Sequence, residues 1–215
     1  MADGIEQIHA QQSMYTLPAV FKDIDEPEHY IQPLDVSQRE PNQSLVLINF
    51  DKGTDKTGLR STIWNDMCTP EKRKDYPFVT CLGKPKGVQI SAIVDVYQRN
   101  RQFPFWLSPR GNGLDCHRTW EAFYLDIIPI VWNSSLNILY EHLPVVIISD
   151  HRQLTESFLL DQFKDISRKK LFNNQTYHYE KLRHAYWRDL ILQQAKHKDI
   201  SERRGRCWRA NRISQ

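Results

Sequence analysis

The chain has 215 residues, of which 40% are hydrophobic and 26% are charged. This length suits one domain of roughly 150 residues with extensions and is hardly enough for two full Rossmann domains. The formal net charge of +3 does not by itself indicate nucleic-acid binding. No apolar stretch reaches the roughly 18 residues of a membrane-spanning helix. We therefore expect neither a nucleic-acid partner nor a membrane segment in this chain.

The first 43 residues are rich in proline, acidic and amide side chains and lack a sustained hydrophobic period. We expect a loosely ordered leader over residues 1–43, or the remnant of an N-terminal domain, with a short helix near residues 19–23. Because its first residues are acidic and polar, this segment is not typical of a signal peptide. Residues 44–50 then form a nearly continuous apolar run, which predicts a parallel strand buried on both faces.

Helix-like and strand-like segments alternate along the rest of the chain. Apolar residues at helical spacing predict the helices, and short β-rich runs predict the strands. The helices are expected at residues 58–67, 88–102, 115–126, 152–169 and 176–196, and the further strands at residues 76–81, 103–107, 127–131 and 143–149.

This alternation predicts an α/β fold, a three-layer Rossmann-like domain with a parallel sheet. The domain is expected to span residues 44–196, including the C-terminal helices. The basic residues of 197–215 predict a solvated tail, and nucleic-acid binding by this tail is the less favoured alternative. Ligands of such sheets bind beyond the carboxyl ends of the strands, where residues 108–110, 132–135 and 149–151 fall.

The four cysteines lack the spacing of a zinc site, and we expect no metal. Isolated buried thiols are the default expectation. A disulfide between Cys68 and Cys81 is the alternative, because these residues end a predicted helix and a predicted strand. For Cys116, a packing role is favoured over that of a nucleophile.

Residues 106–131 give the strongest indication of function. An apolar strand leads into a turn with Gly111 and Gly113, and the helix that follows carries Arg118 and Glu121. A tight turn before a helix N-terminus offers backbone N–H groups and a positive dipole end to an anion. Arg118 adds a positive charge with forked donors, and Glu121 lies one turn further along the same helix face. A cation for phosphate and a carboxylate for sugar hydroxyls together predict a nucleotide-sugar pocket.

The same segment resembles a known family. Its ordered combination is similar to the C-terminal nucleotide-sugar-binding half of an inverting GT-B glycosyltransferase, of the exostosin-like and ribitol xylosyltransferase-like type. The similarity covers roughly residues 44–165. It rests on Pro109-Arg110-Gly111-Asn112-Gly113, on Arg118, on Trp120-Glu121-Ala122 and on Ile128-Pro129-Ile130-Val131.

The resemblance implies roles for individual residues. Arg118 would contact the diphosphate of a UDP-sugar, and Glu121 would contact its ribose hydroxyls. Gly111 and Gly113 would let the backbone approach the phosphates, and Arg110 would supply a second positive charge. The resemblance also implies metal-independent sugar transfer to a glycan hydroxyl in a Golgi lumen, without a cofactor. No catalytic residue is assigned, because an acceptor domain with its usual base is not recognisable in the leader.

Other residues keep two interpretations each. Arg60, after the first strand, is a further candidate for a phosphate contact. Asn133 and Ser134 either bind the donor or form an ordinary turn. Asp115 and Asp150 are expected to be helix N-caps rather than catalytic groups.

The leading functional hypothesis is transfer of a sugar from a nucleotide-sugar donor to a glycan acceptor, by a chain that is either complete or a fragment. The alternative is a non-catalytic α/β interaction module descended from such an enzyme. Under that alternative, Arg118 and Glu121 form no more than a helix-surface pair.

Overall fold

The computed structural model describes residues 44–83, 93–172 and 176–195. The predicted leader, its short helix near residues 19–23 and the predicted basic tail lie outside the described residues. The described part divides into two compact units, one that ends at His178 and one that begins at Tyr179.

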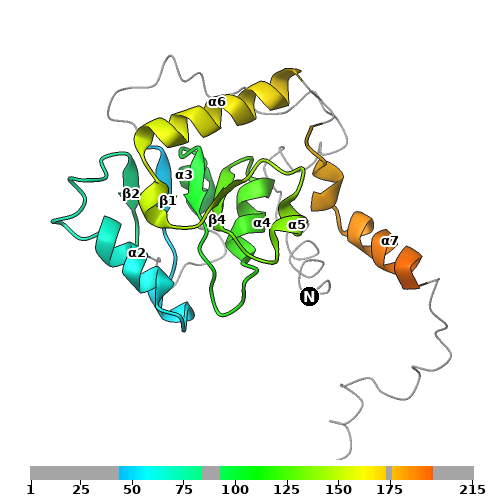
Figure 1. Cartoon of the computed structure of the whole chain (residues 1–215), viewed down its shortest axis with the longest axis horizontal. Coiled ribbons are helices and arrows are strands. Elements are labelled where there is room, and N and C mark those ends of the chain that lie inside the picture. The colour runs from blue at the N-terminus through cyan, green and yellow to red at the C-terminus, as the bar shows by residue number, and fades with distance from the viewer. Residues whose placement is uncertain (1–43, 84–92, 173–175, 196–215) are drawn as a thin grey trace, which may run out of the picture. The chain divides into compact units, whose positions relative to one another are not determined.

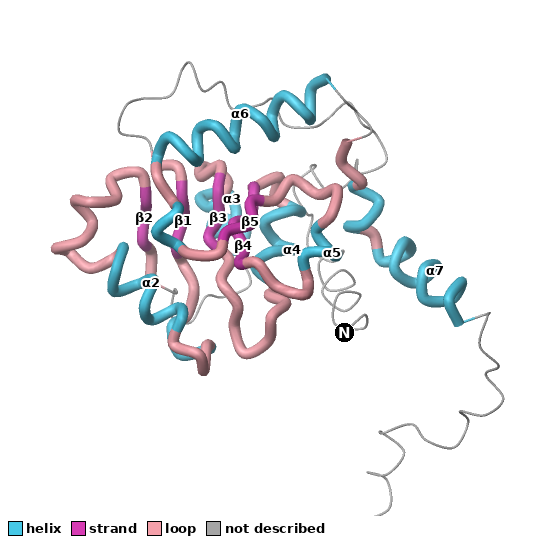
Figure 2. Tube along the Cα trace, viewed as in Figure 1, coloured by secondary structure: helices cyan, strands magenta, loops and turns pink. Residues whose placement is uncertain are grey.

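Five parallel strands form one sheet in the order β2-β1-β3-β4-β5, and Figure 2 shows β2, β1 and β3 side by side. In the register, Val46 lies opposite both Val79 and Phe105. The parallel sheet confirms the predicted fold class, and every predicted strand from residue 44 onward is present, most of them shorter than expected. The strands are β1 (Val46–Ile48), β2 (Val79–Cys81), β3 (Phe105–Leu107), β4 (Ile128–Trp132) and β5 (Val146–Ile148).

The helices follow the strands in the predicted alternation. The predicted helix at 152–169 begins later, because a 3₁₀ turn and a short extended segment intervene, and the predicted helix at 176–196 is divided in two. Helix α5 was not predicted. The helices are α2 (Leu59–Met67), α3 (Ile93–Asn100), α4 (His117–Tyr124), α5 (Asn137–Tyr140), α6 (Glu156–Phe172) and α7 (His184–Ala195), and the 3₁₀ helices are η4 (Lys52–Thr54), η6 (His151–Gln153) and η7 (Tyr179–Leu182).

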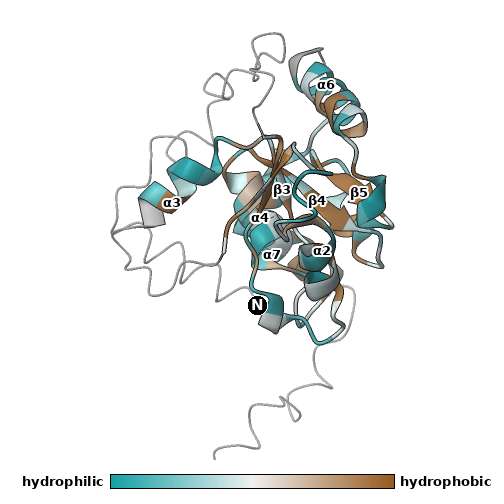
Figure 3. Cartoon of the chain, turned by 90° about the vertical axis from the view of Figure 1, so that its left-hand side faces the viewer, coloured by the Kyte–Doolittle hydropathy of each residue, from teal (hydrophilic) through white to brown (hydrophobic). Residues whose placement is uncertain are grey.

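Helices cover both faces of the sheet, which gives the three layers (Figure 1). Side chains alternate along each strand, so Val46 and Ile48 face one side and Leu47 the other. The first side packs against α2 and α6, and the second against α3 and α4. In Figure 3 the strands are largely hydrophobic between these helices. The core therefore lies on both faces of the sheet.

Cys68 and Cys81 form a disulfide, with their Cα atoms 5.6 Å apart. The default expectation of isolated thiols is wrong for this pair, and the alternative is confirmed. Cys68 is the C-cap of α2, and Cys81 is the last residue of β2. The two meet because β2 returns beside β1, a consequence of topology that spacing along the chain does not contain. Cys116 is a free thiol.

The unit that begins at Tyr179 holds η7 and α7. The indole of Trp187 donates a hydrogen bond to the carbonyl oxygen of Lys181 at 2.6 Å, which ties the two helices together. Leu190 of α7 is 39% exposed. Among the helices of the described residues, none combines the length and the apolar character that crossing a bilayer requires.

Candidate functional site

The candidate site lies where the strand order changes direction. From β1 the chain moves outward to β2 and then returns to the other side of β1 to form β3. The connections after β1 and β3 therefore leave the sheet in opposite directions at the carboxyl ends of these two strands, which is where ligands of such sheets bind. The loop after β3 holds the predicted glycine turn.

Arg118 extends from the first turn of α4 to the carboxyl end of β1. Its Nη1 atom donates a hydrogen bond to the side-chain oxygen of Asn49, and its Nη2 atom lies 3.3 Å from the carbonyl oxygen of the same residue. The guanidinium also stacks on Trp106, with 5.1 Å from its central carbon to the ring centroid. The guanidinium thus bridges α4, β1 and β3 at the mouth of the sheet.

The side chain of Arg118 is partly buried. Loss of hydration lowers the pKa of its guanidinium to about 10, although the charge of Glu121 opposes this shift. Within the described residues, the Nε atom of Arg118 is buried and has no hydrogen-bond partner. A buried donor without an acceptor is costly, so this N–H is suited to an acceptor that binds from outside the chain.

Asn49 was missed by the sequence analysis. It follows β1 directly and is 9% exposed, and its Oδ1 atom accepts a hydrogen bond from the indole of Trp106 at 2.5 Å as well as one from Arg118. One amide oxygen therefore orients both the ring and the guanidinium above it. The available signal was a single amide between Ile48 and Phe50, at the end of an otherwise apolar run.

Glu121 lies one turn after Arg118 and is also partly buried. Burial raises the pKa of its carboxyl group, and the charge of Arg118 partly offsets this rise. On α3, burial and the charge of Glu121 raise the pKa of Tyr97 to about 12. Tyr97 of α3 therefore lies near Glu121 of α4. Because both Arg118 and Glu121 are partly buried, they do not form an exposed helix-surface pair.

Arg60 clamps the loops after β1 and β3 to each other. It is 4% exposed, and its Nε and Nη2 atoms donate hydrogen bonds to the carbonyl oxygens of Arg110 and Pro109 at 2.9 and 3.0 Å. Its Nη1 atom donates to the carbonyl oxygen of Asp51 at 3.1 Å and to the hydroxyl of Thr54 at 2.6 Å. A fifth hydrogen bond runs from its Nη2 atom to the sulfur of Cys116. This geometry favours a structural clamp over the predicted phosphate contact.

The glycine turn is packed against this clamp. Gly111 is buried, and a Cβ atom at its position would lie 3.1 Å from Nη2 of Arg60. The backbone N–H of Gly111 donates to the carbonyl oxygen of Gly113 at 3.1 Å, which closes the turn. Gly113 is exposed. Arg110 is partly buried, and its Nε atom is a second buried donor without a partner within the described residues.

Helix α4 begins one residue later than expected. The N-cap is Cys116, so the prediction that Asp115 is the N-cap is wrong. Asp115 instead accepts hydrogen bonds at its Oδ1 atom from the backbone N–H of Cys116 and from the indole of Trp120, both at 2.9 Å. The sulfur of Cys116 accepts the fifth hydrogen bond of Arg60, at 3.3 Å. The thiol is therefore part of the clamp.

The turn after β4 contains the next two predicted site residues. Asn137 of α5 donates from Nδ2 to the Oδ1 atom of Asn133 at 2.6 Å, and its own Oδ1 atom accepts from the backbone N–H of Ser134 at 3.1 Å. The hydroxyl of Ser134 accepts from the backbone N–H of Leu136 at 3.2 Å. These local bonds favour the ordinary turn over donor binding.

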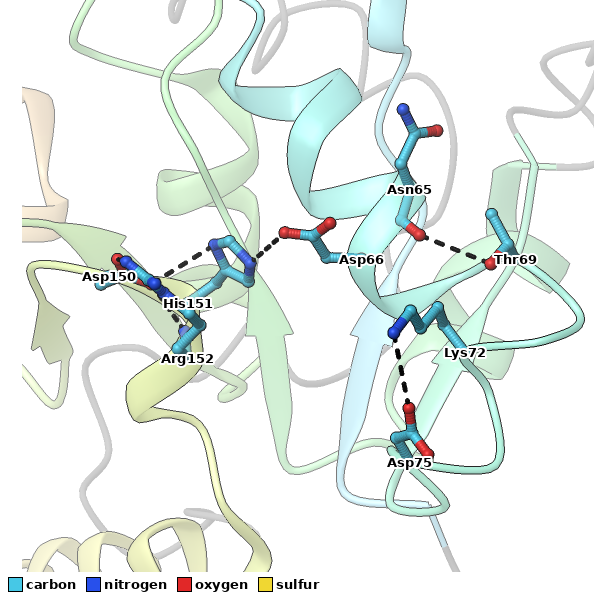
Figure 4. Close-up of polar contacts among 8 residues, drawn as sticks. All are labelled: Asn65, Asp66, Thr69, Lys72, Asp75, Asp150, His151 and Arg152. Carbon is cyan, nitrogen blue, oxygen red and sulfur yellow. Dashed lines mark hydrogen bonds and ion pairs between the residues drawn. The ribbon is translucent and has the colours of Figure 1, made fainter.

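The loop after β5 carries a buried histidine between two carboxylates (Figure 4). Asp150 caps η6, and Gln153 completes a capping box, which confirms the predicted N-cap. The Nε2 atom of His151 lies 2.9 Å from Oδ2 of Asp66 on α2, and its Nδ1 atom lies 3.6 Å from Oδ1 of Asp150. Hydrogen bonds from Arg152 lower the pKa of Asp150. The histidine thus joins α2 to the end of β5.

Within the described ranges, no group of three or more histidine, cysteine, aspartate or glutamate side chains is arranged to hold a metal ion. Comparison of the sequence with models of protein families finds no match, and comparison with curated proteins finds no significant match either.

Proposed function

We propose that this domain binds the diphosphate of a nucleotide sugar, of UDP type, at the carboxyl ends of β1 and β3. The observation that carries the proposal is the position of Arg118, whose guanidinium lies at the carboxyl end of β1 with a buried Nε–H that lacks a partner within the described residues. Phosphate oxygens are strong acceptors for such a group. The N-terminus of α4 adds a positive dipole end to the same region.

The chemistry we propose is sugar transfer to a glycan hydroxyl. When the bond to the anomeric carbon breaks, negative charge builds on the leaving diphosphate. Arg118 and the α4 N-terminus would stabilise that charge through groups already in place. Glu121, when ionised, would accept hydrogen bonds from the ribose hydroxyls. We assign no catalytic base.

Calorimetry with UDP and UDP-sugars tests the proposal. We expect the full chain to bind UDP, and Arg118→Ala and Glu121→Ala each to weaken binding by about tenfold or more, since each removes charge-assisted hydrogen bonds. The matched control is Arg168→Ala, which removes a 71% exposed arginine of α6 and should leave affinity unchanged. Absence of UDP binding, or binding that is indifferent to both site substitutions, would refute the proposal.

A second candidate function is a non-catalytic module with the same fold. It is favoured by the guanidinium groups of Arg60 and Arg118, which donate hydrogen bonds to acceptors of the chain itself. Transfer assays with UDP-sugars and glycan acceptors separate the two candidates. Attachment of the sugar to the glycan acceptor with release of UDP, lost in Arg118→Ala, supports the transferase.

A further inference from the structure

The Cys68–Cys81 disulfide connects two elements that flank the candidate site. Cys68 caps the C-terminus of α2 and is 2% exposed, and Cys81 ends β2. Strand β2 has three residues and lies at the edge of the sheet, where β1 is its neighbour. An edge strand this short forms few ladder hydrogen bonds, so its position depends on other connections.

Helix α2 also depends on tertiary contacts, because it is short. It has nine residues, and its N-cap, Gly58, has a φ of 80° and no side chain, so the carboxylate of Asp55 accepts the hydrogen bond from the backbone N–H of Arg60 instead. Isolated helices of this length are unstable in water. The contacts that hold α2 are the packing of Ile63 and Met67, the Asp66–His151 contact, the disulfide at its C-terminus and the clamp of Arg60 at its N-terminus.

The disulfide and the clamp therefore lie at opposite ends of one short helix. Arg60 reaches from the first turn of α2 to the carbonyl oxygens of Pro109 and Arg110, in the loop with the glycine turn. A displacement of α2 would move the guanidinium of Arg60. The carbonyl oxygens that accept its hydrogen bonds, in the loops after β1 and β3, would then lose their position. The state of the cysteine pair is in this way coupled to the site.

We propose that the Cys68–Cys81 disulfide is a redox switch for the candidate site. In the oxidised chain it fixes α2 and β2, and through Arg60 it orders the loops after β1 and β3. Reduction by a dithiol transfers two electrons and two protons to the pair: the S–S bond breaks, each sulfur becomes a thiol, and the dithiol becomes a disulfide. The reduced chain opens locally at α2 and β2. The site is thus organised in an oxidising compartment and loosened in a reducing one.

Backbone amide hydrogen exchange on the full chain, before and after treatment with dithiothreitol, tests the switch. We expect exchange to rise on the order of 100-fold in residues 59–67 and 79–82, because the released loop restores conformational freedom to these segments. Residues 109–116 should follow through the clamp. Helix α6 carries neither cysteine and is the internal reference, with unchanged exchange.

Variants isolate the pair from the other cysteines. The double variant Cys68→Ser/Cys81→Ser should exchange rapidly with and without dithiothreitol, whereas Cys207→Ser, which leaves both the pair and the clamp intact, should respond as the unaltered chain does. If the double variant does not fold, the unaltered chain, reduced and then alkylated, provides the same measurement.

Two outcomes would overturn the inference. One is alkylation of Cys68 and Cys81 without a reductant, which would show that the pair is not bonded. The other is exchange in residues 59–67 and 109–116 that does not change on reduction. UDP calorimetry on the oxidised chain is a separate measurement. If the oxidised chain binds UDP but hydrogen exchange does not change on reduction, only the redox switch is refuted. If hydrogen exchange changes on reduction but the oxidised chain does not bind UDP, only the proposed function is refuted.

Discussion

Replacement of Arg60 by methionine is the sharpest test of how the candidate site is held together. The substitution removes five hydrogen bonds from a side chain that is 4% exposed, and it keeps an unbranched chain that can still pack against Phe50. The loops after β1 and β3 would lose the group that joins them. We expect the domain to remain folded and to lose stability.

The magnitude follows from the acceptors left behind. The hydrogen bond to the carbonyl oxygen of Pro109 is buried, and leaving that oxygen unpaired costs about 2 kcal/mol. The bonds to the carbonyl oxygens of Asp51 and Arg110 are partly buried, so water can replace Arg60 there, at a cost of about 0.5 kcal/mol each. The free energy of unfolding should therefore fall by about 3 kcal/mol, which lowers Tm by roughly 6–12 °C in a domain of this size.

Thermal and urea unfolding followed by circular dichroism measure this change. Arg168→Met is the matched control, since its side chain is 71% exposed and its ion pair with Asp165 is worth less than about 0.5 kcal/mol. Arg60→Lys keeps the charge without the forked donors and should fall between the two. If Arg60→Met and Arg168→Met melt within about 1 °C of each other, the clamp does not stabilise the fold.

Four further predictions concern the turn, the site and the core. Gly111→Ala should destabilise the domain by about 1–2 kcal/mol, because the new Cβ would lie 3.1 Å from the pinned Nη2 of Arg60, whereas Gly83→Ala, with no atom within 4 Å, should have no effect on Tm. The pKa of Glu121 is raised by burial, so UDP affinity should decline, as pH falls, at a higher pH than an ordinary glutamate would give; a similar decline in Glu121→Gln would contradict this role. Because burial raises the pKa of Glu121, protonation of its carboxyl group stabilises the folded state at low pH. This stabilisation is lost as pH rises through the pKa of Glu121 in the folded state. At neutral pH, Glu121→Gln should therefore be at least as stable as the unaltered chain. Leu159→Ala, at a fully buried position of α6, should cost about 3 kcal/mol in urea unfolding, and a cost below about 1 kcal/mol would show that α6 does not seal the core.

Much of the fold could be predicted from hydrophobic patterning. The run from Leu45 to Ile48 is buried on both faces of the sheet, as its continuous apolar character indicated. Helix boundaries were harder to predict because tertiary contacts set them. Asp115 has the side chain of a typical N-cap, yet it bonds the indole of Trp120 and leaves the cap to Cys116. Local preference cannot distinguish these arrangements.

The candidate site was predictable only where its residues share one helix. Arg118 and Glu121 could be paired from their spacing on α4. Asn49 and Arg60 could not, because their roles depend on β1 and β3 being neighbours in the sheet. The Cys68–Cys81 disulfide has the same origin in topology. Contacts between segments far apart in sequence follow from strand order, which hydrophobic periodicity does not encode.

The position of α6 in the chain has a consequence for biosynthesis. Leu159, Phe163 and Ile166 cover one face of the sheet and are the last core side chains of their unit to leave the ribosome. Strand β1, which precedes the other four strands of the sheet, pairs with β3 only after Trp106 has been synthesised. The nascent chain therefore carries an uncovered apolar surface through most of its translation, a situation that favours aggregation and chaperone capture. Expression vectors that stop ahead of Glu156 would make that transient exposure permanent.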